Sequence, residues 1–208
     1  MKKIILILLS ASIVFLSVVA SDCPAAEKSN VRAFFLSFAV PGLGQYYAGH
    51  GGSAKLFIAS ELLMWGAFLY NSRMEDSYYK DYISHASLHA GVNPEGFGAS
   101  YLNAIGFYQS SFEYNQYQKQ VSYDPVLYSG DKMWNWDDNA NRLRYKNLRE
   151  RELDYKNNIK YCAAGIILNH FLSGLNASKL VQNMNETPSA INVNIMDRGL
   201  SVNYLRSF

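Results

Sequence analysis

Two histidines and an aspartate are spaced so that they would share one face of a helix. Asp81, His85 and His89 recur every four residues, and imidazole nitrogen with carboxylate oxygen is a donor set that Zn²⁺ and related metals accept. The sequence has no HExxH motif, no second cluster and no obvious fourth ligand. We therefore interpret these residues as ordinary surface side chains, and we predict neither a metal site nor a bound cofactor.

A carboxylate interrupts one apolar stretch, and two polar side chains interrupt another. Glu61 lies within Ser53–Tyr70, and Asn169 and His170 lie within Ile159–Leu180. A carboxylate at the centre of a bilayer costs about 2.5–3.5 kcal/mol on insertion scales, so Glu61 should face protein. We expect both polar residues to hydrogen-bond to it as contacts between helices; the alternative is a proton- or ligand-responsive intramembrane pair of Glu61 and His170.

The remaining chemistry-bearing residues indicate no reaction. The segment 41–44, Pro-Gly-Leu-Gly, lacks the Gly-Lys-Ser/Thr continuation of a phosphate-binding loop. Cys162 lies in an apolar stretch, where a thiol is usually inert. Because no Ser-His-Asp arrangement is readable either, we predict no catalytic residues and a protein that is not an enzyme.

Composition points to a membrane. Of the 208 residues, 49% are hydrophobic and 17% are charged, against about 25% charged in a typical soluble domain. The net charge of +2 and the high apolar content exclude a disordered chain. The absence of a chain-wide basic excess argues against a nucleic-acid partner. Cys23 and Cys162 are too few for a disulfide framework.

The N-terminus has the layout of a secretory signal. Lys2 and Lys3 precede an unbroken apolar run from Ile4 to Ala20, and basic, apolar and small residues in that order are typical of a signal peptide. We predict a signal peptide over 1–20, cleaved after Ala20, and a linker over 21–30. The alternatives are an uncleaved anchor, or lipidation at Cys23, which Asp22 disfavours.

Two further apolar stretches predict a membrane hairpin. Val31–Ala48 and Ser53–Tyr70 are each about as long as the ~20 residues of a helical span, and the turn 49–52 between them is short and glycine-rich. Short connections make antiparallel neighbours. Pro41 should interrupt the first arm, which predicts that 41–47 lies at a membrane face or in a re-entrant bend. A buried hairpin in a soluble helical protein is the alternative.

The polar segment from 71 to 159 predicts amphipathic helices. Apolar stripes run from Tyr79 to Ala86 and from Tyr101 to Phe112, and we expect their tyrosines to form an aromatic core rather than an interaction groove. Asp137 or Asp138 should cap the next helix. The basic stretch 141–160, with seven Lys/Arg against three Asp/Glu, continues into Ile159–Leu180 without Gly or Pro until Gly165, which predicts one long third helix.

The tail over 184–208 predicts a short β-hairpin. Apolar residues alternate with polar ones on both sides of a turn at 197–199. The alternating apolar residues are Ile191, Val193, Ile195, Leu200, Val202 and Tyr204. Since a lone hairpin is marginal in water, it should pack on the helices or join a partner's sheet.

Three landmarks in the chain give it a family resemblance. The first is the opening motif of Pro41, Gly42, Gly44, Gln45 and Tyr47. The second is Trp134 and Trp136, followed by 141–149; the third is Asn169 and His170, followed by Asn176. Over roughly 31–183 the chain resembles a bacterial family of envelope proteins of unknown function, marked by a Pro-Gly-x-Gly-Gln-x-Tyr membrane hairpin. The resemblance implies membrane association and export but no activity. Members often have Asp where this chain has Asn176, so a carboxylate role there does not carry over.

Together these features predict a mainly α, membrane-associated fold. The helical domain covers 31–183, with a hairpin, amphipathic helices, a long third helix and a C-terminal β-hairpin. We predict an exported envelope membrane protein, non-catalytic and structural or complex-forming, in either the inner or the outer membrane. Its expected partners are membrane lipid and another envelope protein. The alternatives are a small membrane enzyme or transporter component that uses the Glu61 and His170 pair, and a soluble periplasmic helical domain.

Overall fold

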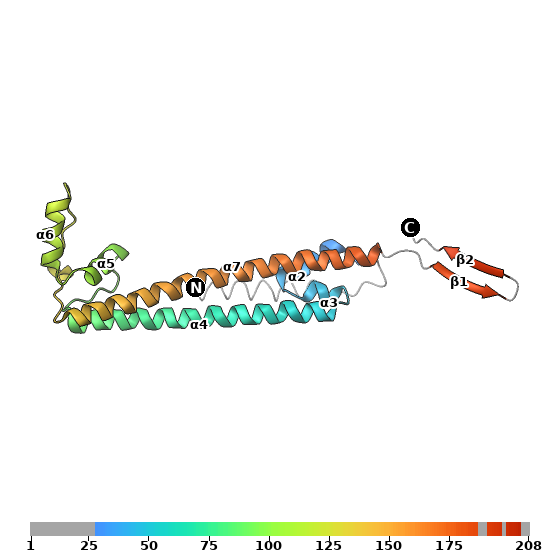
Figure 1. Cartoon of the computed structure of the whole chain (residues 1–208), viewed down its shortest axis with the longest axis horizontal. Coiled ribbons are helices and arrows are strands. Elements are labelled where there is room, and N and C mark those ends of the chain that lie inside the picture. The colour runs from blue at the N-terminus through green and yellow to red at the C-terminus, as the bar shows by residue number, and fades with distance from the viewer. Residues whose placement is uncertain (1–27, 187–190, 197–198, 205–208) are drawn as a thin grey trace. The chain divides into compact units, whose positions relative to one another are not determined.

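The computed structural model describes residues 28–186, 191–196 and 199–204, and these are mainly helical (Figure 1). In chain order the elements are α2 (Asn30–Ala39), α3 (Leu43–Tyr47), α4 (Gly51–His89), α5 (Ala99–Phe107), α6 (Ser111–Val121), the 3-10 turn η1 (Gly130–Lys132), α7 (Asn139–Asn185), β1 (Ile191–Met196) and β2 (Gly199–Tyr204). The predicted signal peptide, its cleavage site and Cys23 lie outside the described residues.

The chain divides into two compact units, each of which is described by itself. Unit 1 comprises Met1–Leu63 with Gly165–Phe208, and unit 2 comprises Met64–Ala164. The sequence predicts one helical domain over 31–183, whereas the contacts divide that range in two. Helices α4 and α7 each contribute one part to unit 1 and the other part to unit 2.

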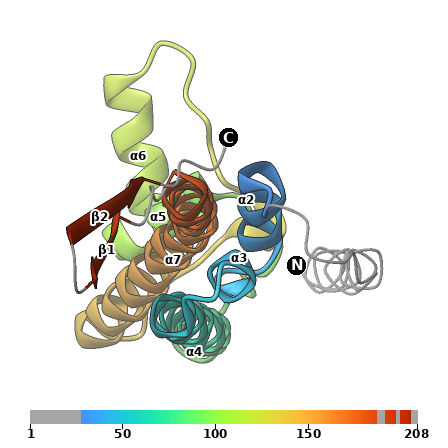
Figure 2. The same cartoon turned by 90° about the vertical axis from the view of Figure 1, so that its right-hand side faces the viewer.

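In unit 1, the stretch predicted as the first arm of a hairpin forms two short helices. The side chain of Ser29 accepts from the backbone N–H of Arg32 and starts α2, and α2 ends at Ala39 because Pro41 has no N–H to continue it. Helix α2 has 10 residues and rises about 15 Å, half the ~30 Å of a bilayer core. Neither short helix is therefore a complete span. Figure 2 shows both beside the ends of α4 and α7.

Helix α4 is longer than the sequence analysis predicts. The apolar stretch Ser53–Tyr70 and the stripe Tyr79–Ala86 belong to one helix of 39 residues, because nothing between them breaks the backbone: Gly66 is the sole glycine after the first turn and no proline is present. Within the described residues, α4 is the one helix that is long and apolar enough to cross a membrane, by length and composition.

Helix α7 covers both the basic stretch and the apolar stretch, as the scarcity of breakers predicts. It has 47 residues, and a carboxylate oxygen of Asp138 accepts from the backbone N–H of Ala140 at 3.2 Å. Asp138 is therefore the residue of the two candidates that meets the free amides at the start of this helix.

The core of unit 2 is aromatic, in agreement with the sequence. Tyr82, Tyr101, Trp134, Trp136 and Tyr145 are all buried in one cluster. The predicted stripe from Tyr101 to Phe112 is wrong as one helix, because α5 ends at Phe107 and α6 begins at Ser111. The break leaves residue 110 free to form a backbone bridge to residue 135, and it leaves Phe112 exposed.

In the tail, β1 and β2 pair antiparallel, with Val193 opposite Val202 and Ile191 opposite Tyr204. What the two strands pack against stays a prediction.

Candidate functional site

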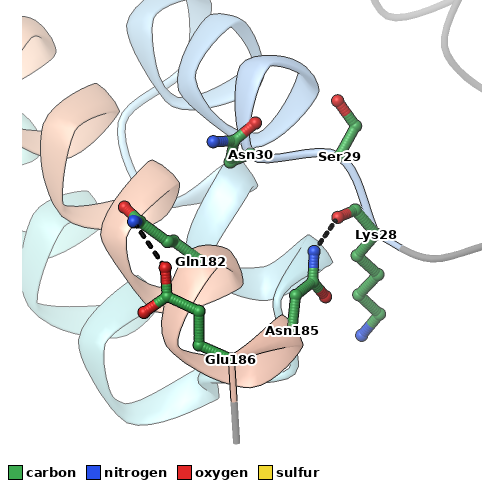
Figure 3. Close-up of a pocket in the computed structure, with 6 residues that line it drawn as sticks. All are labelled: Lys28, Ser29, Asn30, Gln182, Asn185 and Glu186. Atoms are coloured by element: carbon green, nitrogen blue, oxygen red, sulfur yellow. Dashed lines mark hydrogen bonds between the residues drawn. The ribbon is translucent and has the colours of Figure 1, made fainter. Parts of the chain in front are cut away.

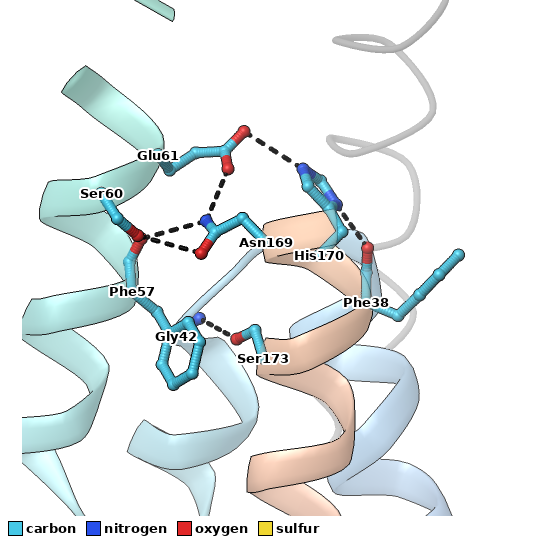
Figure 4. Close-up of polar contacts among 8 residues, drawn as sticks. All are labelled: Phe38, Gly42, Phe57, Ser60, Glu61, Asn169, His170 and Ser173. Carbon is cyan, nitrogen blue, oxygen red and sulfur yellow. Dashed lines mark hydrogen bonds and ion pairs between the residues drawn. The ribbon is translucent and has the colours of Figure 1, made fainter. Parts of the chain in front are cut away.

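The break at Pro41 leaves backbone groups that need partners, and α7 supplies them. In a continuing helix the carbonyl of Phe38 would accept from the N–H of Gly42. Instead, the Gly42 N–H donates to Ser173 Oγ at 3.0 Å, and the Phe38 carbonyl lies 2.6 Å from His170 Nδ1. Because a carbonyl can only accept, Nδ1 is the donor. His170 and Ser173 are one turn apart on α7, so one face of that helix meets both sides of the break (Figure 4).

The same histidine reaches Glu61 on α4. His170 Nε2 lies 3.1 Å from Glu61 Oε1, and Asn169 Nδ2 donates to Glu61 Oε2 at 2.8 Å. Asn169 Oδ1 lies 2.9 Å from Ser60 Oγ, which can donate to it. The structure thus brings together Glu61, Asn169 and His170 as the sequence predicts (Figure 4). The side chains of Glu61 and His170 are 15% and 26% exposed.

A second set of buried polar contacts centres on Gln45. Its Oε1 accepts from Ser37 Oγ at 2.6 Å, and its Nε2 donates to the Ser173 carbonyl at 2.9 Å and to Asn176 Oδ1 at 3.2 Å. The N–H of Gly44 donates to Ser37 Oγ at 2.8 Å. Ser37, Gln45 and Ser173 are 0% exposed, and each has partners, as buried polar groups require. We call Ser37, Gln45, Ser173 and Asn176 the Gln45 network.

The glycines of the motif permit close approach of these helices. A Cβ on Gly44 would lie 2.0 Å from the Ala33 carbonyl and 2.8 Å from Ala177 Cβ. Gly42 has a φ of +99°, and a Cβ there would lie 2.7 Å from the Ala54 carbonyl. Pro41, Gly42, Gly44 and Gln45 therefore act together: they end α2, turn the chain and seat it against α4 and α7.

Tyr47, the last residue of the opening motif, contacts the residues at the start of α2. Its hydroxyl accepts from the backbone N–H of Ser29 at 3.2 Å. The ring also lies 5.9 Å from Lys28 Nζ and 6.0 Å from Arg32 Cζ, within reach of cation–π attraction.

The second landmark of the sequence is structural within unit 2. Trp136 Nε1 donates to the Ile105 carbonyl at 2.8 Å, and Trp134 Nε1 donates to the Tyr108 carbonyl at 3.2 Å. The Tyr145 hydroxyl donates to the Leu102 carbonyl at 3.0 Å. These side chains hold α5 and the segment after it in the aromatic core, so they carry no exposed chemistry.

The two histidines of α4 contact residues near the start of α7 and not Asp81. His89 Nδ1 lies 2.8 Å from Asp137 Oδ2, and His85 Nε2 lies 3.0 Å from the Asn141 carbonyl, while Asp81 is exposed. The hydrogen bond from His89 lowers the pKa of Asp137, and burial lowers the pKa of His85. Nowhere in residues 28–186 or the described strands do three or more His, Cys, Asp or Glu form a group that could hold a metal ion.

A shallow polar hollow lies where α2 begins and α7 ends (Figure 3). It is lined by Lys28, Ser29, Asn30, Gln182, Asn185 and Glu186. Asn185 Nδ2 donates to the Lys28 carbonyl at 2.9 Å, and Gln182 Nε2 donates to Glu186 Oε1 at 2.8 Å. The first bond joins the residues before α2 to the end of α7, and the second stays at the end of α7. We assign the hollow no ligand.

Sequence reasoning missed Ser37 and Ser60. Both are small hydroxyl residues within apolar stretches, where they look like neutral helix positions. For Ser37 the available signal was its place just before the predicted backbone break, since freed amides and carbonyls at membrane depth need polar partners.

Comparisons with protein families, with curated proteins and with solved structures find no match to this chain. The resemblance to the envelope family therefore stays a prediction, and the roles above rest on this chain's own contacts.

Proposed function

We propose that the protein is an exported, membrane-associated module of a bacterial cell envelope, with a non-catalytic, structural or complex-forming role. The observation that carries the proposal is the surface of unit 1, where many large apolar side chains are exposed while several polar side chains are fully buried.

Inside unit 1, the fully buried side chains include Ser37, Gln45 and Ser173. Outside, α2, α4 and α7 all present large apolar residues. The exposed set is Val31, Phe35, Phe38, Leu56, Ile58, Leu62, Leu63, Ile167, Leu168, Phe171, Leu172 and Leu175. Soluble monomers rarely expose contiguous apolar surface on this scale, whereas helices in lipid bury their polar groups against one another.

Unit 2 provides an internal comparison. Its buried side chains are mostly aromatic and aliphatic, with Tyr82, Ile105 and Tyr145 almost fully enclosed. Unit 1 instead buries small residues, with the apolar cluster of Ala33, Ala48, Ala177 and Val181 beside the polar side chains. The two units therefore differ in the size of what they bury: unit 2 encloses large aromatic rings, and unit 1 leaves its large apolar side chains on the outside.

Charge supports the same placement for the first half of α4. Between Lys55 and Arg73 the single charged residue is Glu61, and α7 has no Lys, Arg, Asp or Glu between Lys160 and Lys179. We propose that the first half of α4 crosses the bilayer beside the end of α7, and that α2 and α3 form a re-entrant hairpin against them. In this proposal the C-terminal strands form a β-hairpin that joins a partner's sheet.

A matched pair of substitutions on α4 tests the placement. Leu63 and Leu88 are 75% and 76% exposed on the same helix, but only Leu63 lies within the proposed span. An arginine at the centre of a span costs about 2.5–3.5 kcal/mol on insertion scales. Leu63→Arg should shift the full-length chain from the carbonate-resistant membrane pellet to the soluble or degraded fraction, and Leu88→Arg should leave it in the pellet.

Two results would contradict the proposal. One is wild-type protein that is released by carbonate and behaves as a monomer without detergent. The other is equal membrane retention of Leu63→Arg and Leu88→Arg, because surface leucines in water tolerate arginine equally well.

A further inference from the structure

We propose that Glu61 and His170 together bind one proton at neutral pH, and that this proton holds the end of α2 and the first half of α4 against α7. The inference rests on the proposed function in one respect: lipid around the site excludes water, which could otherwise hydrogen-bond to the two acceptors in place of the proton. It assigns a ligand, the proton, to the site.

The geometry of His170 carries the argument. Its Nδ1 lies 2.6 Å from the Phe38 carbonyl, and its Nε2 lies 3.1 Å from Glu61 Oε1. A carbonyl oxygen and an ionised carboxylate oxygen are both acceptors without a proton of their own. Both ring nitrogens therefore face acceptors, from two different helices (Figure 4).

A neutral imidazole beside an ionised Glu61 cannot satisfy both contacts. With the proton on Nδ1, the bare Nε2 faces the carboxylate; with the proton on Nε2, the bare Nδ1 faces the Phe38 carbonyl at the shorter distance. One acceptor–acceptor contact remains with either tautomer, and in a partly buried site this leaves polar groups unpaired, which is unfavourable.

One added proton removes the conflict in two equivalent ways. If it is on the ring, the imidazolium donates from both nitrogens and Glu61 stays a carboxylate. If it is on Glu61, the carboxylic acid donates to Nε2 while Nδ1–H donates to Phe38. The site has the same composition in both cases and no net charge, which lowers the cost of its burial.

The surroundings of the pair favour the protonated state. The Phe38 carbonyl is among the last four of α2, the end of a helix that attracts a positive charge. Asn169 directs its amide N–H to Glu61 Oε2 and turns its own oxygen toward Ser60, so the other carboxylate oxygen, Oε1, is the one directed at His170.

On each helix that carries one of these contacts, the nearest charged residue along the chain is at least six residues away. These residues are Arg32 on α2, six residues before Phe38; Lys55 on α4, six residues before Glu61; and Lys179 on α7, nine residues after His170. On α3 the titratable side chains are Tyr46 and Tyr47, and the Tyr47 hydroxyl accepts from Ser29.

The substitution Glu61→Gln replaces the carboxylate with an amide, whose N–H can donate to His170 Nε2 without an added proton. An amide at this position can accept from Asn169 through its oxygen and donate to Nε2 through its nitrogen, so His170 needs only its Nδ1 proton. We expect Glu61→Gln to fold, to leave His170 as a neutral imidazole, and to abolish the pH dependence that the wild-type site confers.

The test uses the full chain in lipid nanodiscs at about pH 7. Nitrogen-15 NMR of labelled histidine reports the protonation of each ring, and the signals of His170 are identified by their loss in His170→Gln. Infrared spectra report a protonated carboxyl as a band that is lost in Glu61→Gln. The matched control is His50→Gln, because His50 contacts a backbone carbonyl of its own turn and should leave both signals unchanged.

Wild-type protein should show one of two results: a doubly protonated His170 ring, or a neutral ring with a protonated Glu61 carboxyl. As the pH is raised, loss of that proton should lower the melting temperature of wild type but not of Glu61→Gln. A neutral His170 together with an ionised Glu61 at neutral pH would overturn the inference. If that result is found in protein that resists carbonate extraction, the inference fails and the proposed function stands. If the one-proton site is found in a chain that carbonate releases, the proposed function fails and the inference stands.

Discussion

Substitution of Gly44 tests the packing of the opening motif most directly. A Cβ at this position would lie 2.0 Å from the Ala33 carbonyl, 2.6 Å from Ser37 Oγ and 2.8 Å from Ala177 Cβ. Two of these neighbours belong to α2 and one to α7, and the nearest is backbone, which cannot rotate away. Either α3 moves off α2 or the carbonyl is displaced.

The expected loss follows from two contributions. Overpacking of this kind costs about 1–3 kcal/mol, and the movement also weakens the buried hydrogen bond from Gly44 to Ser37, which contributes about 0.5–1.5 kcal/mol. Against this, alanine gains up to about 1 kcal/mol in a helix. Taking the middle of each range, we expect Gly44→Ala to lower the free energy of unfolding by about 2 kcal/mol.

The assay is denaturant or thermal unfolding of the full chain in a mild detergent, with two other glycines as controls. A Cβ on Gly66 of α4 meets nothing within 4 Å, so Gly66→Ala should be neutral or stabilising. A Cβ on Gly174 would lie 3.0 Å from the Phe34 ring, and Gly174→Ala should fall between the two because a ring can move. If Gly44→Ala is as stable as Gly66→Ala, the close approach of α2, α3 and α7 is refuted.

Two further predictions concern unit 2. Trp136→Phe removes the hydrogen bond to the Ile105 carbonyl and should lower the free energy of unfolding by about 1–3 kcal/mol, measured by denaturant unfolding followed by near-ultraviolet circular dichroism. The control Tyr123→Phe, at a fully exposed position, should stay within about 0.5 kcal/mol of wild type. Equal effects of the two substitutions would argue against the aromatic core. Burial raises the pKa of Tyr101 and of Tyr128 to about 12, from a usual value of 10.0. Since the folded state keeps these hydroxyls protonated, their contribution to stability is complete below about pH 10 and is lost between about pH 10 and pH 12. Ultraviolet titration should therefore show late-ionising tyrosines that ionise together with unfolding, and complete ionisation near pH 10 with the fold intact would contradict this.

The local features of the fold could be predicted because they depend on residues close together in the chain. Pro41 lacks an N–H, so a break there follows from covalent structure. The scarcity of Gly and Pro predicts the continuity of α7, and Asp137 or Asp138 as a capping side chain predicts its start. The length of α4 was predicted less well. This helix continues past Tyr70, where the sequence changes from apolar to polar, because such a change alters what surrounds a helix but does not interrupt its backbone hydrogen bonds.

The contacts of Glu61 with Asn169 and His170 could be predicted for a different reason. Polar groups within apolar stretches need each other wherever water is absent, and few candidates existed. Which atoms meet could not be predicted. The contact of His170 with the Phe38 carbonyl and the pairing of His89 with Asp137 depend on how helices distant in sequence are rotated and aligned.

The sequence by itself determined that the chain is mainly helical, that a helix cannot continue through Pro41, and that polar residues interrupt the apolar stretches. Only the tertiary structure decided that Gln45 is fully buried in unit 1 while large apolar side chains are exposed there. It alone also decided that the freed carbonyl of α2 and the carboxylate of α4 meet on the two nitrogens of one imidazole. The physical reason is that periodicity fixes which residues share a face of one helix, whereas the partner of that face depends on packing between helices, for which the order of residues along the chain carries little information.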